Sequence, residues 1–402
     1  MQVTLPPDLH DTDDGRDAER ILRTCVHCGF CNATCPTYQL LGDERDGPRG
    51  RIYQIKEMLE HGRASEEARL HLDRCLTCRA CETTCPSGVE YHRLLEIGRA
   101  FVERHLPRPF AERLQRDALL AVVPQPERFG PLLALARAAR PLLPASIKAS
   151  LPTKPAAAEH WPARDHPRRV LLLEGCVQSV THPRINAATA RVLDRLGVRA
   201  LPAAGCCGAL SHHLSREARM RDTLRRNIDA WWPEVEAGAE AVLLTASGCA
   251  PTVRDYGRLL RNDPAYAERA ARLAALAMDI SEFIEGEDLS ALDPLPATER
   301  PIAFQAPCSL QHGLQRAGRV ESLLTGLGFK LTPVADAHLC CGSAGSYAVL
   351  QRELSERLLA NKIRNLEAGD PALIATANIG CLMHLEKATE RPVRHWIELL
   401  DV

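Results

Sequence analysis

The chain has no excess of either charge: 50 Lys and Arg residues balance 51 Asp and Glu residues, which gives a formal net charge of −1 over 402 residues. This balance excludes the overall basic character on which nucleic-acid binding depends, so we expect no nucleic-acid partner. Long hydrophobic runs are also missing. No segment approaches the roughly 20 apolar residues of a membrane-spanning helix, so we expect no transmembrane segment, and any membrane contact to be peripheral or through a partner.

Two further absences restrict the classes of protein to which the chain can belong. The N-terminus, M-Q-V-T-L-P-P-D-L-H-D-T-D-D, is polar and acidic and has no apolar core of a secretory signal. The sixteen cysteines are therefore expected to be reduced thiols in the cytoplasm, with metal binding as their use. We find neither G-x-G-x-x-G opening a helix nor G-x-x-x-x-G-K-[ST], so we expect no flavin or nucleotide in this chain.

Eight of the cysteines lie in two similar runs, C-V-H-C-G-F-C-N-A-T-C-P (25–36) and C-L-T-C-R-A-C-E-T-T-C-P (75–86). Each run is C-x2-C-x2-C-x3-C-P, the bacterial pattern for a [4Fe–4S] cluster. Three thiolates two residues apart can surround one face of a cubane, and the fourth, before Pro, binds the other cluster of the pair. This rule predicts two clusters, one held by Cys25, Cys28, Cys31 and Cys85 and the other by Cys75, Cys78, Cys81 and Cys35.

Structural zinc is the main alternative for these runs, with disulfides as another. Zinc needs four thiolates per ion but has no use for the C-P ending. The ferredoxin spacing also occurs twice, which favours two clusters. The D-G-P-R-G-R segment (46–51) between the runs either presents Arg49 and Arg51 to the clusters or a partner, or is a solvated turn.

The cluster-binding segment should be mostly helical. The pattern predicts a helix over residues 51–62, with Gly62 as its C-cap, and another over 90–106, which ends at Pro107. Eleven prolines between residues 107 and 167 indicate a linker. Within it, residues 130–154 carry basic side chains and no acid. They form either a membrane- or partner-binding segment or, as we favour, a helical connector packed on its own protein.

The remainder is an internal duplication. V-L-L-L-E-G-C (170–176) matches I-A-F-Q-A-P-C (302–308), G-C-C-G-A-L (205–210) matches L-C-C-G-S-A-G (339–345), and A-V-L-L-T-A-S-G-C (241–249) matches A-L-I-A-T-A-N-I-G-C (372–381). The first and last cysteines are 73 positions apart in both copies. Each copy reads as strand, helix, strand, C-C-G turn, helix and strand, which predicts a largely parallel α/β unit. The first helices are expected over 186–197 and 316–328. All four cysteines of each copy then lie at the carboxyl ends of strands, where ligands gather.

These motifs resemble known families. The C…CCG…C repeat resembles the cysteine-rich domain of heterodisulfide reductases, and the helical module resembles the ferredoxin domains of succinate dehydrogenase-like enzymes. Together they resemble the iron–sulfur subunits of anaerobic glycerol-3-phosphate dehydrogenase, lactate utilisation proteins and, above all, the family of glycolate oxidase (glycolate dehydrogenase) iron–sulfur subunits. The stretches that carry the last resemblance run from residue 25 to 381 and include C-N-A-T-C-P-T-Y-Q-L-L-G-D-E, D-G-P-R-G-R-I-Y, N-I-D-A-W-W-P and T-A-N-I-G-C.

The resemblance implies an α+β multidomain protein, with a mostly helical two-[4Fe–4S] ferredoxin-like module followed by a duplicated α/β cysteine-rich (CCG) repeat. We expect the module at residues 1–106, a Pro-rich helical linker at 107–167, repeat 1 at 168–290 and repeat 2 at 300–402. The family implies that flavoprotein partners oxidise glycolate to glyoxylate, while this subunit passes the electrons towards a quinone or other membrane-associated acceptor. The chain would then be an electron-transfer subunit without catalysis of its own, cytoplasmic and peripherally bound to the inner face of the cell membrane.

The repeats depart from the family pattern at one point. The heterodisulfide reductase-type repeat usually ends in C-x-x-C, but here the endings are C-A-P-T (249–252) and C-L-M-H (381–384), which leaves His384 as a fifth ligand in the second copy only. The repeat thiols therefore hold a further cluster, form a redox-active dithiol or are a remnant of the fold. They are Cys176, Cys206, Cys207 and Cys249 in repeat 1, and Cys308, Cys340, Cys341 and Cys381 in repeat 2.

Three other functions stay open at this point. One is the iron–sulfur subunit of a related lactate or glycerol-3-phosphate dehydrogenase. Another is a catalytic disulfide reductase that uses the CCG cysteines. The third is a zinc-stabilised assembly protein.

Overall fold

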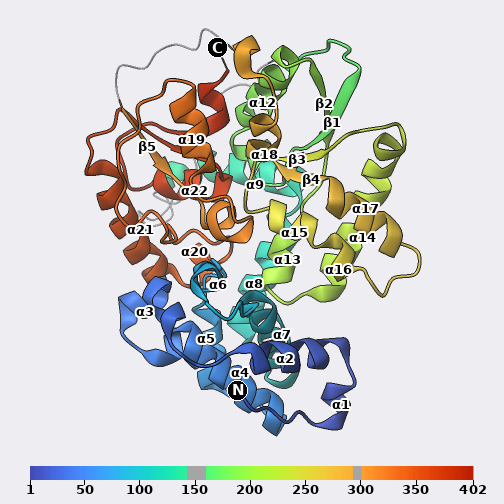
Figure 1. Cartoon of the computed structure of the whole chain (residues 1–402), viewed down its shortest axis with the longest axis vertical. Helices are drawn as coiled ribbons and strands as arrows, with labels where there is room; N and C mark the ends of the chain where they lie inside the picture. The colour runs from blue at the N-terminus through green and yellow to red at the C-terminus, as the bar shows by residue number, and fades with distance from the viewer. Residues whose placement is uncertain (143–159, 293–300, 402) are drawn as a thin grey trace.

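The computed structural model describes residues 1–142, 160–292 and 301–401 of the chain. The N-terminal helices form the lower body of the molecule in Figure 1, and the two repeats lie side by side above it. Repeat 1 is drawn in green to yellow and repeat 2 in orange to red. The molecule is therefore an α+β assembly with a helical module at one end and two small sheets at the other.

Helices make up the regular structure of the N-terminal module. In chain order they are α1 (Pro7–His10), α2 (Asp13–Thr24), η1 (Phe30–Thr34), α3 (Pro36–Leu41), η2 (Glu44–Asp46), α4 (Pro48–His61), α5 (Glu66–Asp73), α6 (Ala80–Thr84) and α7 (Tyr91–His105). The helix expected over 51–62 starts three residues earlier, because Pro48 suits a first helical turn, and it ends at Gly62 with φ 64° as predicted. The helix expected over 90–106 is α7, which ends before Leu106 and Pro107.

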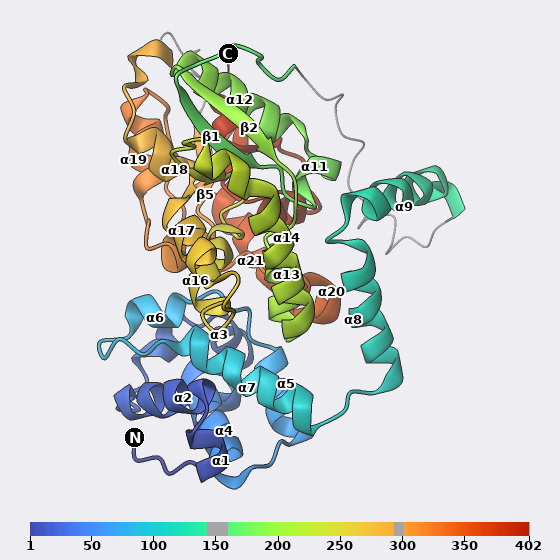
Figure 2. The same cartoon turned by 90° about the vertical axis from the view of Figure 1, so that its right-hand side faces the viewer.

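The expected linker packs against the rest of the protein. It contains α8 (Phe110–Val122), α9 (Pro126–Ala138) and η3 (Arg140–Leu142), and Figure 2 shows α8 and α9 rising along the side of the molecule from the module towards the repeats. Leu120 of α8 and Leu133 of α9 are buried. Of the basic segment 130–154, only the part up to residue 142 lies within the described residues.

Repeat 1 contains a four-stranded parallel sheet in the order β2-β1-β3-β4. Its strands are β1 (Arg168–Leu173), β2 (Val198–Ala203), β3 (Val242–Leu244) and β4 (Ala277–Asp279). Its helices are α11 (Gln178–Thr181), α12 (Arg184–Arg195), α13 (Ala209–His213), α14 (Glu217–Glu236), α15 (Ala250–Arg254), α16 (Tyr256–Leu259), α17 (Ala267–Leu276), α18 (Ile280–Glu285) and η4 (Leu289–Leu292). The helix expected over 186–197 is α12, which begins and ends two residues earlier.

Repeat 2 contains a three-stranded parallel sheet in the order β5-β6-β7. Its elements are β5 (Ile302–Gln305), the π-helical turn η5 (Ser309–Gly313), α19 (Arg319–Gly326), α20 (Tyr347–Leu350), α21 (Arg352–Glu367), β6 (Leu373–Thr376), α22 (Ile379–Leu385), β7 (Val393–His395) and η6 (Trp396–Leu399). The helix expected over 316–328 is α19, which begins after Gly318, a residue with a left-handed backbone (φ 76°), and ends two residues early.

The strand expected before the second C-C-G turn is wrong within the described part of repeat 2. Where repeat 1 has β2, repeat 2 has only the single bridge between Ile302 and Leu331. Ile302 donates to the Lys330 carbonyl at 2.8 Å, and Thr332 donates back to the Ile302 carbonyl at 2.9 Å. Beyond Thr332 the chain leaves β5 and enters a turn at 335–338, where Asp336 has a left-handed backbone (φ 48°), so the pairing stops after one bridge.

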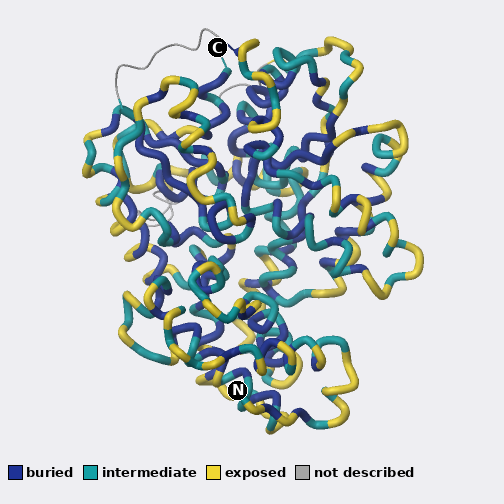
Figure 3. The backbone as a smooth tube through the Cα atoms, in the orientation of Figure 1, coloured by how far each residue is buried: buried dark blue, intermediate teal, exposed yellow. Residues whose placement is uncertain are grey.

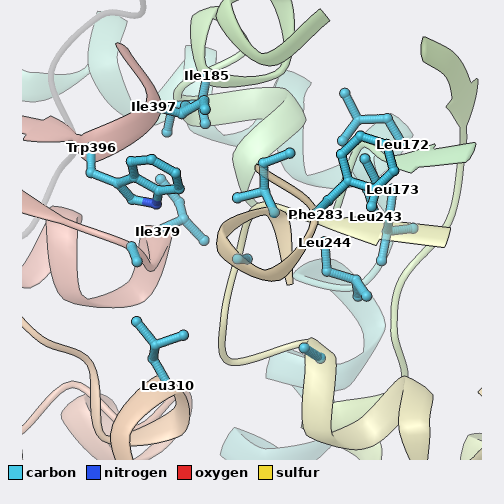
Figure 4. Packing of buried hydrophobic residues seen from close by; sticks show 14 of the residues in the cluster. Leu172, Leu173, Ile185, Leu243, Leu244, Phe283, Leu310, Ile379, Trp396 and Ile397 are labelled. Carbon is cyan, nitrogen blue, oxygen red and sulfur yellow. The ribbon is translucent and has the colours of Figure 1, made fainter. Parts of the chain in front are cut away.

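The two repeats share one hydrophobic core. Figure 3 shows the buried backbone concentrated through the middle of the upper body. In the close view of Figure 4, Trp396 and Ile397 of η6 lie beside Ile185 of α12, which joins the repeats, while Leu243 and Leu244 belong to the repeat 1 sheet. Among the described helices none is long and apolar enough to cross a membrane.

Candidate iron–sulfur and redox sites

The two cysteine loops of the module, residues 25–31 and 75–81, have the same unusual backbone. Each has a left-handed conformation at its third and fifth residues: His27 (φ 61°) and Gly29 (φ 87°) in the first loop, Thr77 (φ 56°) and Arg79 (φ 64°) in the second. Such values cost a residue other than glycine about 1–3 kcal/mol and persist only where the surroundings impose them. They turn backbone N–H groups inwards, and the Thr77 N–H lies 3.5 Å from the Cys75 sulfur.

The fourth cysteine of each run lies beside the opposite loop. Cys35 follows η1 and Cys85 follows α6. These two turns pack together, with the hydroxyls of Thr34 and Thr84 3.0 Å apart. The result is an exchange of thiols between the runs: one cavity is lined by Cys25, Cys28, Cys31 and Cys85, and a second by Cys35, Cys75, Cys78 and Cys81, with Cys81 also bordering the first.

The donor atoms of both cavities fit a cluster with thiolate ligands. Among the described residues, no Asp or Glu lines either cavity. Burial, followed by repulsion from neighbouring thiolates, raises the pKa of Cys31 to about 11 and raises the pKa of Cys81 well above its ordinary value. Packed thiols of this kind lose their protons readily to bound iron, because the metal supplies the missing positive charge.

Two arginines border these cavities. Arg49 lines the first, and a Cβ on Gly29 would lie 2.8 Å from its guanidinium. Arg51 is 1% exposed and lines the second, donating to the His71 carbonyl at 2.7 Å and to Asp46 at 3.3 Å. Burial opposes the Arg51 charge, but Cys75 and other nearby groups outweigh it and raise its pKa. Of the two interpretations of this segment, a solvated turn is wrong for Arg51.

The cysteines of repeat 1 form a row of sulfur contacts at the carboxyl end of its sheet. Cys176 contacts Cys206, Cys206 contacts Cys207, and Cys207 contacts Cys249. Hydrogen bonds from the thiols of Cys176 and Cys207, joined by the Gly208 N–H, lower the pKa of Cys206 to about 3. The four sulfurs thus lie together although they come from three separate strand ends.

Repeat 2 has the same row. The sulfurs of Cys308 and Cys340 are 3.8 Å apart, those of Cys341 and Cys381 are 3.4 Å apart, and Cys340 contacts Cys341. Asn378 donates its side-chain N–H to the Cys381 sulfur at 3.4 Å. The structure therefore brings all four cysteines of each copy together as predicted, although the C-C-G turn of repeat 2 does not follow a strand.

The row of thiols in repeat 2 differs from that in repeat 1 by a buried lysine nearby. Lys362 of α21 is 3% exposed and donates to the Asp336 carbonyl at 2.9 Å. Burial lowers its pKa, and Cys341 leads the thiols that oppose this effect. The equivalent residue of repeat 1 is Ile228, in the hydrophobic core. Sequence reasoning missed Lys362, although the exchange of an apolar for a basic residue is visible when the two C-C-G-led helices are aligned.

His384 lies behind the second C-C-G turn. Its Nε2 is 3.2 Å from the Ser355 hydroxyl, which donates to the Gly342 carbonyl. Its Nδ1 has no hydrogen-bond partner among the described residues. Burial lowers its pKa to about 4, so the ring is neutral at pH 7. A neutral imidazole suits a metal ligand, and this role stays a prediction.

The second cysteine loop contacts repeat 2. Leu76 packs in one apolar cluster with Cys340, Tyr347 and Leu354, and Cys78 and Cys308 border the same cluster. Thr83, in α6, makes a 2.9 Å hydrogen bond with His312, whose other ring nitrogen faces the His338 carbonyl. No local pattern indicates this contact, because its residues are more than 200 positions apart. One set of repeat thiols therefore adjoins the second cavity.

Comparison with known proteins agrees with this arrangement. Residues 21–89 match the model of the 4Fe-4S dicluster domain, and residues 170–254 and 302–386 each match the model of the cysteine-rich domain. The glycolate oxidase iron-sulfur subunit of Escherichia coli (strain K12) is 51% identical over 100% of this chain and 98% of its own length. This chain belongs to the family of glycolate oxidase iron–sulfur subunits.

Other members and relatives extend the comparison. A probable glycolate oxidase iron-sulfur subunit of Bacillus subtilis (strain 168) is 30% identical over 92% of the chain and 89% of its own length. Lactate utilization protein A of Shouchella clausii is 26% identical over 58% of the chain and 98% of its own length. The family resemblance drawn from the motifs is confirmed, and with it the α+β fold and the role of an iron–sulfur electron-transfer subunit.

Proposed function

We propose that this chain carries electrons from a flavoprotein that oxidises glycolate to glyoxylate towards a quinone-type acceptor. The observation that carries the proposal is the continuous series of thiol sites, in which two exchanged four-thiol cavities adjoin each other and the second adjoins the thiols of repeat 2. The 51% identity to the Escherichia coli subunit over the whole chain supports glycolate as the substrate of the complex.

Two [4Fe–4S] clusters would be held by thiolates in the exchanged pattern, and each would supply a carrier of single electrons. The chain's own residues position and screen these sites. The backbone N–H groups of His27 and Thr77 face the sulfurs of Cys25 and Cys75, and Arg51 sets a buried positive charge beside the second cavity. The proposed ligands are Cys25, Cys28, Cys31 and Cys85 for one cluster, and Cys75, Cys78, Cys81 and Cys35 for the other.

The repeat thiols form a further redox or cluster site in this proposal. Four sulfurs in contact at the end of each sheet are a suitable donor set, and Lys362 favours negative charge in repeat 2. The sites are Cys176, Cys206, Cys207 and Cys249 in repeat 1, and Cys308, Cys340, Cys341 and Cys381 in repeat 2.

The proposal also specifies the partners of the chain and its location in the cell. The flavin would reside in separate flavoprotein subunits, and a membrane quinone as acceptor would hold the complex at the inner face of the cell membrane. We also propose that the chain divides into the module at 1–106, the helical linker at 107–167, and the repeats at 168–290 and 300–402, which agrees with the stretches matched by the two family models.

Replacing Cys78 tests the relay. In the complex isolated with its flavoprotein, Cys78→Ser should abolish glycolate-dependent reduction of a quinone analogue, because it removes a proposed ligand that borders repeat 2. The flavin should stay with its partner. Thr77→Gly is the matched control, since it keeps every thiol of the loop and suits the left-handed backbone.

Full quinone reduction by Cys78→Ser would refute the relay. Assaying the wild-type complex with lactate and glycerol 3-phosphate beside glycolate separates the related dehydrogenases, because faster reduction with either would reassign the substrate.

Disulfide reduction at the repeats is the second candidate, and the 3.4 Å contact between Cys341 and Cys381 favours it. Here two thiolates would pass two electrons to a mixed disulfide and form a disulfide of their own. Turnover of such a substrate by the isolated chain with a dithiol reductant would support this candidate and displace the relay.

A further inference from the structure

The two cysteine loops share a backbone but differ in what covers them. The residue after the first cysteine is Leu76 in the second loop, 6% exposed, and Val26 in the first, 68% exposed. The residue before the third cysteine is Ala80 in the second loop, 1% exposed, and Phe30 in the first, 63% exposed. One loop therefore has its apolar positions covered, while the equivalent positions of the other face solvent.

Repeat 2 covers the Leu76 side of the second loop. Leu76 packs against Tyr347 and Leu354 there, and Cys78 and Cys308 border the same cluster. The equivalent of Cys78 in the first loop is Cys28. Of the sixteen cysteines, all within the described ranges, Cys28 alone is exposed. Because the two loops have the same backbone, the exposed apolar positions of the first loop indicate a docking face. The equivalent face of the second loop is already covered by repeat 2.

We infer that Val26, Cys28 and Phe30, together with Tyr53 of α4, form the surface that binds the flavoprotein electron donor; this rests on the proposed function. Electrons pass over short distances, so they should enter where a carrier lies nearest the surface. Tyr53 is 49% exposed, and its ring centre lies 6.2 Å from that of His27. Large apolar and aromatic side chains around one exposed thiol match the centre of a protein interface.

The charges beside this face favour a protein over a lipid surface. A groove next to it is lined by both acidic and basic side chains, with Glu44, Glu57 and Glu67 among the acids and Arg45 and Arg63 among the bases. Anionic lipid attracts clusters of Lys and Arg and is repelled by acids. A polar rim of mixed charge around an apolar centre is instead the usual form of a protein–protein interface.

The test uses the full-length tagged chain, produced anaerobically with the flavoprotein subunits of its complex, and measures flavin retained per chain after purification. V26D/F30D should lower flavin retention at least about tenfold, since a few central apolar residues carry most of the binding energy of an interface. Tyr53→Asp should act in the same direction without altering the cysteine loop. Phe110→Asp is the matched control, because Phe110 is 70% exposed on α8 and should leave retention unchanged.

Iron and acid-labile sulfide content, with bleaching by dithionite, are measured on every variant. If V26D/F30D loses iron, its lower flavin retention could come from a damaged cysteine loop. The result is then decided by Tyr53→Asp, which lies outside that loop. Wild-type flavin retention in both surface variants would overturn the docking face, whereas a wild-type chain that retains no flavoprotein would overturn the proposed function itself. Binding to vesicles of phosphatidylethanolamine and phosphatidylglycerol is measured in parallel. Variants that keep flavin but lose vesicle binding would assign the face to the membrane and also overturn the inference.

Discussion

At the scale of single residues, a buried basic side chain lies beside each of two thiol sites. Arg51 and Lys362 are almost fully buried, one beside the second module cavity and the other beside the thiols of repeat 2. Burying a charge is costly unless it is paired, so each persists because carbonyls, carboxylates or thiols surround it. An anionic group at either site would meet a positive charge that is already fixed in place.

Removing the Arg51 charge should destabilise the protein strongly. Arg51→Met leaves Asp46 with fewer partners in a fully buried position, which typically costs about 3–5 kcal/mol. Arg49→Met is the control, because the Arg49–Glu44 pair is partly exposed to solvent and should contribute at most about 1 kcal/mol. Urea unfolding under anaerobic conditions measures both. Equal losses in the two variants would contradict the structural role of Arg51.

His395 should make the joined repeats sensitive to acid. Burial lowers its pKa to about 4, and its Nε2 lies 2.9 Å from the Thr245 carbonyl of repeat 1. The unfolded chain, with a His pKa of about 6.5, therefore binds more protons than the folded chain between pH 6.5 and 4, so stability falls as pH falls through this window. The loss should approach about 3 kcal/mol.

Urea midpoints at pH 7 and pH 5 check this expectation. His395→Gln should lose less stability between the two pH values than the wild type does. His61→Gln, at an exposed position, serves as the control and should follow the wild type. A pH dependence unchanged by His395→Gln would place the acid sensitivity elsewhere.

At the scale of elements, the C-C-G turns require their glycines. Gly208 and Gly342 both have φ 91°, a conformation that side chains rarely adopt. A Cβ on Gly342 would lie 2.6 Å from the Ser355 backbone carbonyl oxygen, whereas one on Gly208 would meet only the tip of Leu224 at 2.8 Å. A side-chain tip can move aside and a backbone carbonyl inside a helix cannot.

Alanine at these glycines should therefore have graded effects. Gly342→Ala should cost at least about 3 kcal/mol, from the left-handed backbone and the clash together. Gly208→Ala should cost less, and Gly62→Ala only about 1 kcal/mol, since open space surrounds that C-cap. Thermal unfolding of the three variants gives the order directly. A Gly208→Ala loss as large as that of Gly342→Ala would show that the backbone contact does not decide the cost.

Local patterns predicted most elements because they fix backbone chemistry directly. The Gly62 C-cap and the C-C-G turns depend on residues within a few positions, and the structure has them where the sequence places them. The missing strand of repeat 2 was not predictable from its apolar pattern, which resembles that of β2. Whether a strand forms depends on continuous pairing with its neighbour, and in the described part of repeat 2 only Leu331 pairs with β5 before the chain turns at 335–338.

At the scale of the whole molecule, contacts between distant segments escaped sequence reasoning. Spacing within each cysteine run indicated which thiols belong together, because a loop geometry constrains them. The contact of Thr83 with His312, and of Leu76 with Tyr347, depends on how two separately patterned units pack, and no local signal records that. The order of the thiol sites therefore emerged only from the structure.

The number of irons in the intact protein tests how many of these thiol sites hold a cluster. Two [4Fe–4S] clusters give about eight irons per chain, and one further cluster of this type in the repeats would raise the count to about twelve. Anaerobically purified protein should contain at least eight, with matching acid-labile sulfide. Zinc with no labile sulfide would contradict the cluster assignment for all sixteen cysteines.

The exchange of Cys35 and Cys85 between the loops also bears on biogenesis. During translation, Cys85 leaves the ribosome sixty residues after Cys25, the first thiol of the cavity that both line. A partly synthesised chain that ends before Cys81 can complete neither site, because the first lacks Cys85 and the second lacks Cys81. Cofactor insertion at the two sites should therefore be a late and nearly simultaneous event, and a chain interrupted before Cys81 should remain wholly unloaded rather than half-loaded.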